Sequence, residues 1–151
     1  MNEKSLKILE FHKIISQLTE YAASQPGKAM CQNLAPSSDY EEILTWQAQT
    51  TDAVSRVRMK GTISFSGVKD IGDSLKRLEI GSSLNIIELL SISSLLTVAA
   101  RARSYGRHEP QEDDGDSEEF DSLEPMFRAL EPLTPLNNEI KRCILSEDEV
   151  A

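Results

Sequence analysis

Residues 66–81 place the strongest constraint on the fold of this chain, because they form one short amphipathic segment between Gly67 and Gly81. The apolar residues of the segment recur at helical spacing: Ile71, Leu75 and Leu78. Asp70 precedes them, where a carboxylate can cap free backbone amides, and glycine commonly ends a helix. We therefore expect a short helix on which the flanking helices converge, and which carries no reaction of its own.

The rest of the chain also has helical periodicity. It predicts helices over 5–23, 24–34, 38–59, 85–105 and 121–131, and a last one from Asn137 or Asn138. Candidate N-caps are Ser24, Ser38 and Asn85, and the last two have a glutamate three residues later, as in a capping box. Residues 62–66 predict either a short extended segment or a loop. The fold class is therefore all-α: an irregular bundle of about six to seven helices, with residues 85–105 as the central packing helix.

The apolar stripes of these helices predict which side chains are buried. The stripes consist of Ile8, Phe11, Ile14, Ile15, Leu18 and Ala22 in the first helix, Ile43, Trp46, Thr50, Ala53, Val54 and Val57 in the third, and Ile140, Cys143 and Ile144 in the last. A chain of 151 residues is long enough to bury most of its apolar surface in one domain. We therefore expect one compact core.

The net charge of −9 comes from one segment. Nine of the 25 acidic residues lie between His108 and Glu124, where there is no lysine or arginine, and the other 16 acids balance the 16 basic residues. Residues 108–120 contain too few apolar side chains to offset the entropy of ordering, which predicts a mobile acidic insertion. A nucleic-acid module normally carries an excess of basic residues. We expect weak or no nucleic-acid binding by this chain, and the basic group Arg56, Arg58 and Lys60 to be a solvated helix face.

No residue pattern predicts an active site. Cys31 and Cys143 are far apart and lack the spacing of a zinc or redox pair, and His12 has no second ligand beside it. Gly27 and Lys28 lack the other residues of a phosphate-binding loop. We therefore expect no catalytic, cofactor-binding or metal-binding residue. No secretory signal or membrane-spanning run is recognisable, so we expect a cytoplasmic location and no membrane partner.

Several short motifs occur in a characteristic order. They are L-E-F-x-K-I at 9–14, S-x-x-G-K at 24–28, L-x-P-S at 34–37, G-x-x-D-I-x-x-x-L-K-R at 67–77, Gly81, and E-L-L at 88–90. Together they make the chain resemble the N-terminal part of bacterial MutS-related proteins of the second subfamily, which lack the mismatch-recognition domain and carry a C-terminal Smr nuclease domain. The sequence departs from the family at 108–120, and at Glu149, where a glycine is common.

The resemblance implies that residues 1–151 are the N-terminal part of the helical core and lever domain. The chain is then expected to continue after Ala151. The parent protein would be an ATPase that uses ATP and magnesium, with a nuclease domain, and a homodimer that binds branched DNA, restrains homologous recombination or acts on collided ribosomes. Neither the nucleotide-binding loop nor the nuclease domain lies in these residues.

Two hypotheses for the chain follow. In the first, it is a non-catalytic structural module that contacts the remaining domains of the parent, and Asp70, Leu75 and Arg77 hold its joint. Arg77 would pair with a carboxylate of a neighbouring helix: an exposed pair contributes under about 1 kcal/mol, whereas removing one partner of a buried pair costs roughly 3–5 kcal/mol. In the second, the chain is a free-standing helical adaptor for another protein, with the acidic segment available to a basic partner.

Overall fold

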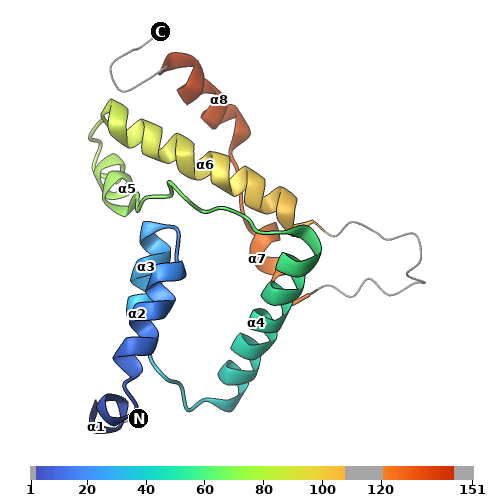
Figure 1. The fold of residues 1–151 in the computed structure, drawn as a ribbon. Coiled ribbons are helices and arrows are strands. Elements are labelled where there is room, and N and C mark those ends of the chain that lie inside the picture. Colours follow the sequence, from blue (N-terminus) through green and yellow to red (C-terminus); the bar gives the residue numbers. More distant parts are fainter. Residues whose placement is uncertain (1–2, 108–120, 145–151) are drawn as a thin grey trace, which may run out of the picture. The chain divides into compact units, whose positions relative to one another are not determined.

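The computed structural model describes residues 3–107 and 121–144 of the chain (Figure 1). Within these residues there are eight helices and no strand: α1 (Glu3–Ile8), α2 (Phe11–Tyr21), α3 (Gln25–Gln32), α4 (Tyr40–Lys60), α5 (Gly72–Glu79), α6 (Ile86–Gly106), α7 (Glu124–Arg128) and α8 (Thr134–Cys143). The all-α prediction is confirmed, and residues 62–65 form a loop without regular structure. The acidic insertion predicted at 108–120 lies outside the described residues.

The helix predicted over residues 5–23 is two helices, α1 and α2. The described residues therefore contain eight helices, instead of the six to seven predicted. Glu10 interrupts the predicted helix with a left-handed backbone (φ 52°), an uncommon conformation for a residue other than glycine. The amide of Glu10 still donates to the carbonyl of Lys7, and its carboxylate accepts a hydrogen bond from Lys13 Nζ at 2.7 Å. Helical periodicity alone does not reveal this break, because the apolar residues continue across it.

Two of the predicted helix starts are confirmed in detail. Ser24 Oγ accepts a hydrogen bond from the amide of Gly27 at the start of α3. At the start of α6, the side chain of Asn85 accepts from the amide of Glu88, and the side chain of Glu88 accepts from the amide of Asn85. Each side chain thus satisfies an amide that has no partner within the helix.

Three other predicted helix starts are corrected. Asp39, not Ser38, caps α4, since its carboxylate accepts from the amide of Glu42. Asp70 is not the N-cap of α5, because Ile71 occupies that position and its side chain makes no capping hydrogen bond. The carboxylate of Asp70 accepts a hydrogen bond from the amide of Gly72, the first residue of the helix. Helix α8 begins at Thr134 instead of Asn137, with a proline in its first turn, where the missing amide costs little.

The chain divides into two compact units. The first comprises Met1–Pro36, Ser64–Val98 and Pro132–Ala151, and the second comprises Ser37–Ile63 and Ala99–Glu131. Helix α6 contributes to both, with residues 86–98 in the first unit and 99–106 in the second. That the two units share one compact core remains a prediction.

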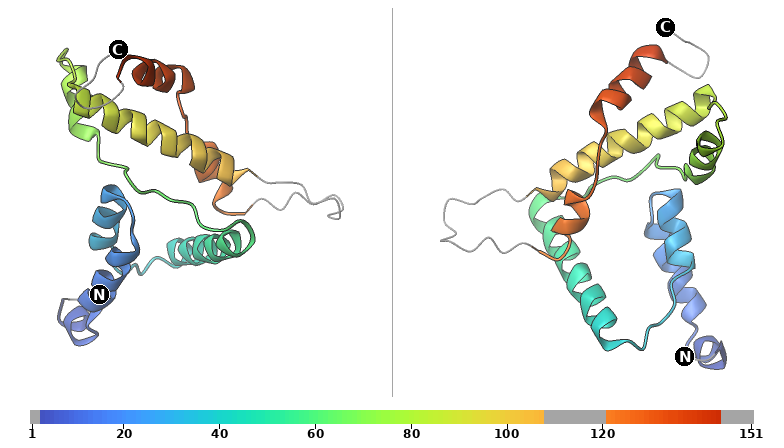
Figure 2. Two further views of the ribbon diagram at one scale, coloured as in Figure 1. Left: turned by 45° about the horizontal axis from the view of Figure 1, so that its top comes forward. Right: turned by 180° about the vertical axis from the view of Figure 1, so that it is seen from behind.

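Helix α6 carries several of the buried side chains among the described residues. Its role as the central packing helix remains a prediction. Five described apolar residues are buried: Leu96, Val98 and Ala102 on α6, Ile140 on α8, and Ile144 directly after it. In the first unit α8 lies along α6 in all three ribbon views (Figures 1 and 2). A polar network joins these two helices, because Ser93 Oγ donates to Asn137 Oδ1 at 2.7 Å and Asn137 Nδ2 donates to Thr97 Oγ1 at 3.1 Å. Such satisfied polar contacts fix one alignment of two helices.

Several apolar stripes that the sequence assigns to the core are exposed instead. On α2, Ile14 and Leu18 face solvent, while Phe11, Ile15 and Ala22 are half-buried. On α4, Trp46, Val54 and Val57 are 41–45% exposed. Leu75 and Leu78 of α5 are likewise exposed, and only Ile71 of that stripe is half-buried. The described residues therefore bury much less apolar surface than the periodicity predicts.

None of the described helices is long and apolar enough to span a membrane.

Candidate functional site: polar junctions at the two ends of helix α6

The first junction joins α5 to the start of α6, within the first unit. Helix α5 ends at a glycine in the left-handed conformation: Gly81 has φ 80°, and its amide donates to the carbonyl of Leu78. The following amide, of Ser82, donates to the carbonyl of Arg77 at 2.9 Å. A side chain at position 81 would be strained in this conformation, so the sharp turn after α5 depends on glycine.

Arg77 connects the two helices across this turn. One of its Nη atoms donates to Glu88 Oε1 at 2.7 Å, and the other donates to the carbonyl of Ser83 at 3.0 Å. Glu88 also accepts from Ser74 Oγ, from α5, and from the amide of Asn85. The amide of Asn85, followed by the charge of Arg77, holds the pKa of Glu88 below its ordinary value. One carboxylate thus caps α6 and pairs with α5.

The three residues predicted to form the joint have different contacts. Arg77 makes the predicted pair with a carboxylate of a neighbouring helix. Asp70 bonds only within its own turn, to the amide of Gly72, and the side chain of Leu75 is 47% exposed. That these three residues hold a joint together remains a prediction, with Arg77 as the member whose geometry supports it.

Arg77→Ala is expected to lower the urea midpoint of the first unit, because Glu88 and the carbonyl of Ser83 lose their shared donor. Lys76→Ala is the matched control, since Lys76 contacts only the exposed Asp73, at 3.1 Å. Such exposed pairs contribute little to stability. Circular dichroism gives the midpoints, and amide exchange of residues 82–88 localises the effect. Equal midpoints for the two variants would contradict the joint role of Arg77.

The second junction lies at the other end of α6, within the second unit, and Arg56 of α4 is its centre. The side chain of Arg56 is only 7% exposed. It forms a two-pronged ion pair with Asp121, through Nε to Oδ2 and through Nη2 to Oδ1, the latter at 2.8 Å. Its Nη1 donates to the carbonyl of Gly106 at 3.1 Å. A cation thus satisfies a carbonyl at the C-terminal end of α6, where helix carbonyls lack partners and the helix dipole is negative.

Aromatic rings cover the same arginine. The guanidinium carbon of Arg56 lies 5.1 Å from the ring centre of Phe127 on α7, and the rings of Tyr105 and Phe127 meet edge to face with centres 5.8 Å apart. The hydrogen bond to Asp121 raises the pKa of Arg56 and, in return, lowers the pKa of Asp121. Asp121 also accepts from the amides of Leu123 and Glu124, which orders the start of α7.

Further contacts tie both flanks of residues 108–120 to α4. Before this segment, Lys60 Nζ donates to the carbonyl of Arg107, and the hydroxyl of Tyr105 donates to the carbonyl of Gly61. After it, the amide and the hydroxyl of Ser122 both donate to Asp52. Asp52 and Arg56 are one helical turn apart on α4, so a single face of this helix holds both flanks.

Arg56 is buried, whereas the charge pattern predicts that it belongs with Arg58 and Lys60 to a solvated helix face. One feature of the sequence does indicate that Arg56 is buried. On a helix, residues 52, 53 and 56 share a face, and Ala53 was already predicted to point inward. An arginine beside a predicted inward position indicates a buried ion pair, whereas Arg58 and Lys60 are exposed as expected.

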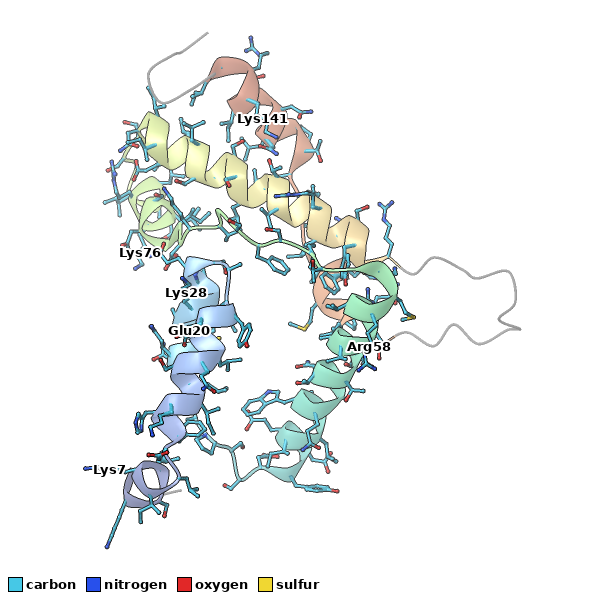
Figure 3. All side chains as sticks on the ribbon, viewed as in Figure 1. Lys7, Glu20, Lys28, Arg58, Lys76 and Lys141 are labelled. Carbon is cyan, nitrogen blue, oxygen red and sulfur yellow. The ribbon has the colours of Figure 1, made fainter. Side chains whose placement is uncertain are left out.

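Both junctions consist of contacts that hold helices together. Among the described residues no three histidine, cysteine or acidic side chains are placed to bind a metal ion. The charges of Arg56, Arg77 and Glu88 are used in contacts between helices. Figure 3 shows Lys7, Lys28, Lys76 and Lys141 on four different helices, not gathered on one. A role of these junctions as a structural joint remains a prediction.

Comparison with known proteins identifies relatives. No protein-family model matches the chain. Over 151 residues, all of the chain, it is 50% identical to a protein named endonuclease MutS2 from Lachnoclostridium phytofermentans and covers 19% of that relative. Over the same length it is 46% identical to endonuclease MutS2 of Agathobacter rectalis and 39% identical to that of Acetivibrio thermocellus, and it covers 18% of each.

The chain thus spans about a fifth of the length of the curated relatives that it matches. The similarity includes residues 108–120, where the motifs indicated a departure from the family, since the matches run over the whole chain. All 151 residues match the N-terminal region of the MutS2 proteins, which confirms the resemblance carried by the motifs at 9–90 and places the chain in this family.

Proposed function

We propose that this chain is a non-catalytic helical module of a larger MutS-family DNA-binding ATPase, and that its joints pass on movements of the parent protein. Two features support the proposal: the buried polar residues bridge helices, and the matched relatives are about five times as long as the chain. Arg56 and Arg77 each link one helix to an end of α6. Within each unit, such a contact can pass a displacement of one helix to the next without a reaction of its own.

The observation that carries the proposal is the exposed apolar surface of α2 and α3. Ile14, Leu18 and Tyr21 lie on one side of α2 at helical spacing, and Met30 of α3 is also exposed. Scattered apolar residues are ordinary on a protein surface, but a continuous apolar stripe indicates a contact with another element. We assign this surface, Ile14, Leu18, Tyr21 and Met30, to contact with the remaining domains of the parent.

Activities of the parent are assigned to parts outside this chain. The relatives are named endonucleases; we propose that a nuclease domain and an ATP- and magnesium-dependent ATPase belong to the rest of the parent. We propose that no step of ATP hydrolysis involves the described residues. We also propose that the parent is a homodimer that binds branched DNA or collided ribosomes.

Thiol labelling of α2 tests the module hypothesis. With Cys31 and Cys143 replaced by serine, Leu18→Cys should react at least tenfold more slowly in a protein of the relatives' full length than in the 151-residue chain. His12→Cys is the matched control, because His12 is an exposed polar residue of the same helix, off the apolar stripe. Its rate should be the same in both proteins. Equal rates for Leu18→Cys in the two proteins would refute the proposal.

The alternative is a free-standing adaptor whose acidic residues, concentrated between His108 and Glu124, bind a basic protein. The genomic reading frame separates the two hypotheses. Continuation beyond Ala151 into a sequence with G-x-x-x-x-G-K-[ST] supports the module, and a stop codon supports the adaptor.

A further inference from the structure

The break between α1 and α2 is confined to a very short stretch of backbone. The amide of Leu9 still donates to the carbonyl of Ser5, four residues back, as in an α-helix. Helix α2 begins at Phe11, directly after Glu10. Glu10 itself has φ 52° and ψ 32°, whereas a helical residue has φ of about −63° and ψ of about −42°. Returning Glu10 to helical angles would therefore join α1 and α2 into one helix.

The sequence at this point contains no helix breaker. Residues 8–13, I-L-E-F-H-K, include no proline or glycine, and glutamate is a good helix former. The left-handed conformation is also unfavourable for a residue with a side chain. Leu133, the other described non-glycine residue with a positive φ, differs in this respect, because Pro132 and Pro135 flank it and interrupt a helix by themselves. Of these two positions, Glu10 is the one that could become helical.

The chain uses glycine at its other left-handed turns. Gly61, Gly67 and Gly81 have φ between 78° and 82°, and glycine adopts this conformation without strain. A turn that is left-handed in every state of the protein is best made with glycine. Glutamate at position 10 tolerates the turn at some cost and suits a helix well, so both conformations remain accessible to it.

The apolar pattern continues across the break. Ile8, Phe11, Ile15, Leu18 and Ala22 are spaced alternately by three and four residues. At 100° per residue they lie within about 80° of one another on a straight helix. In the described structure α1 does not continue the line of α2 (Figures 1 and 2), so Ile8 does not extend this stripe. A conflict between the local pattern and the structure is expected at strained or functional positions.

We propose that residues 5–23 form a two-state arm, in which Glu10 switches between the left-handed conformation described here and the right-handed conformation of one continuous helix. Lys13 can pair with Glu10 in both forms, because residues three apart are also neighbours on a helix. The stripe begins at Phe11 in the broken form and at Ile8 in the straight form, which lengthens it from about 17 Å to about 21 Å. A partner that contacts the whole stripe would select the straight form.

This proposal goes beyond the module hypothesis, and the two can fail separately. The module hypothesis requires that a longer protein cover Leu18. The two-state arm is a property of the 151-residue chain, and residues 5–23 all lie in the first unit. A free-standing adaptor could have this arm, and a module could have a permanent break at Glu10.

Spin labels on either side of the break measure the two forms. Lys4→Cys and Glu20→Cys carry the labels, because both positions are exposed, and Cys31 and Cys143 are replaced by serine. On a straight helix the Cα atoms of residues 4 and 20 are about 24 Å apart, and a break brings them closer. We expect double electron–electron resonance to give both distances in the chain with Glu10, with the shorter one dominant.

Substitutions at residue 10 should shift the ratio of broken to straight form in opposite directions. Glu10→Gly should raise it by about tenfold or more, because glycine adopts the left-handed conformation freely and weakens a helix. Glu10→Ile should lower it by about threefold or more, because a positive φ is a genuine outlier for a β-branched residue. Gln17→Gly is the matched control, since it places glycine at an exposed position that is helical in both forms, and it should leave the ratio unchanged.

Two results would overturn the two-state arm. The first is the absence of the longer distance both from the chain with Glu10 and from Glu10→Ile, with the helix content of each retained in circular dichroism. The second is a shift in Gln17→Gly as large as that in Glu10→Gly, because the ratio would then report only a general loss of helix stability.

Discussion

Arg56→Ala is expected to lower the free energy of unfolding of the second unit by about 3 kcal/mol, the lower end of the range for one partner removed from a buried ion pair. The loss has three sources. Asp121 keeps its charge without its counter-ion, the carbonyl of Gly106 loses its donor, and the ring of Phe127 loses its cation. Urea unfolding followed by the emission of Trp46, the single tryptophan of the chain, reports on the helix that carries Arg56.

Arg58→Ala is the matched control for this experiment. Arg58 is two residues further along the same helix and is exposed (labelled in Figure 3). Its loss should change the free energy of unfolding by no more than about 0.5 kcal/mol. If Arg56→Ala were as mild as Arg58→Ala, the pair with Asp121 would not stabilise the unit, and the role assigned to Arg56 would be wrong.

Gly106→Ala is expected to destabilise the second unit by about 2 kcal/mol or more, as overpacking does in a tightly packed site. A Cβ at position 106 would clash with Cβ and Cγ of Phe127. These atoms are close to the backbone of α7, so the ring cannot turn away to make room. At an exposed position inside a helix, replacing glycine by alanine stabilises a protein by about 0.5–1 kcal/mol. A loss of stability in Gly106→Ala would therefore report the contact with Phe127.

The expected contrast with an exposed neighbour makes this prediction sharper. Ser104→Ala changes an exposed position in the same final turn of α6 and should leave the midpoint nearly unchanged or slightly raised. Trp46 emission in urea again measures both variants. An unchanged or raised midpoint for Gly106→Ala would mean that α7 does not pack against the end of α6 as described.

Local sequence signals predicted the helices well. The capping box of Asn85 and Glu88, the cap by Ser24 and the glycine stop at Gly81 are confirmed, because each depends on residues within one turn of the helix end. The shifts at Asp39 and Asp70 are of one residue each. At Asp39 the shift arises because two neighbouring polar side chains, Ser38 and Asp39, can compete for the same free amides.

Contacts between distant residues could not be predicted in this way. Arg56 and Asp121 are 65 residues apart, and Ser93 and Asn137 are 44 apart. The sequence around either residue of such a pair does not indicate which residue is its partner. The periodicity predicts apolar faces on α2 and α4. It does not predict which elements cover these faces, because an apolar stripe indicates burial of a helix face without indicating its packing partner. For Trp46 and Val54 the described residues leave that face open.

The contacts from α4 to both flanks of residues 108–120 have an evolutionary consequence. Arg56 and Lys60 hold the chain just before the segment, and Asp52 and Arg56 hold it just after. None of these contacts uses a residue between 108 and 120. Asp52, Arg56 and Asp121, which make these contacts, are therefore expected to change together or remain fixed among descendants of the gene.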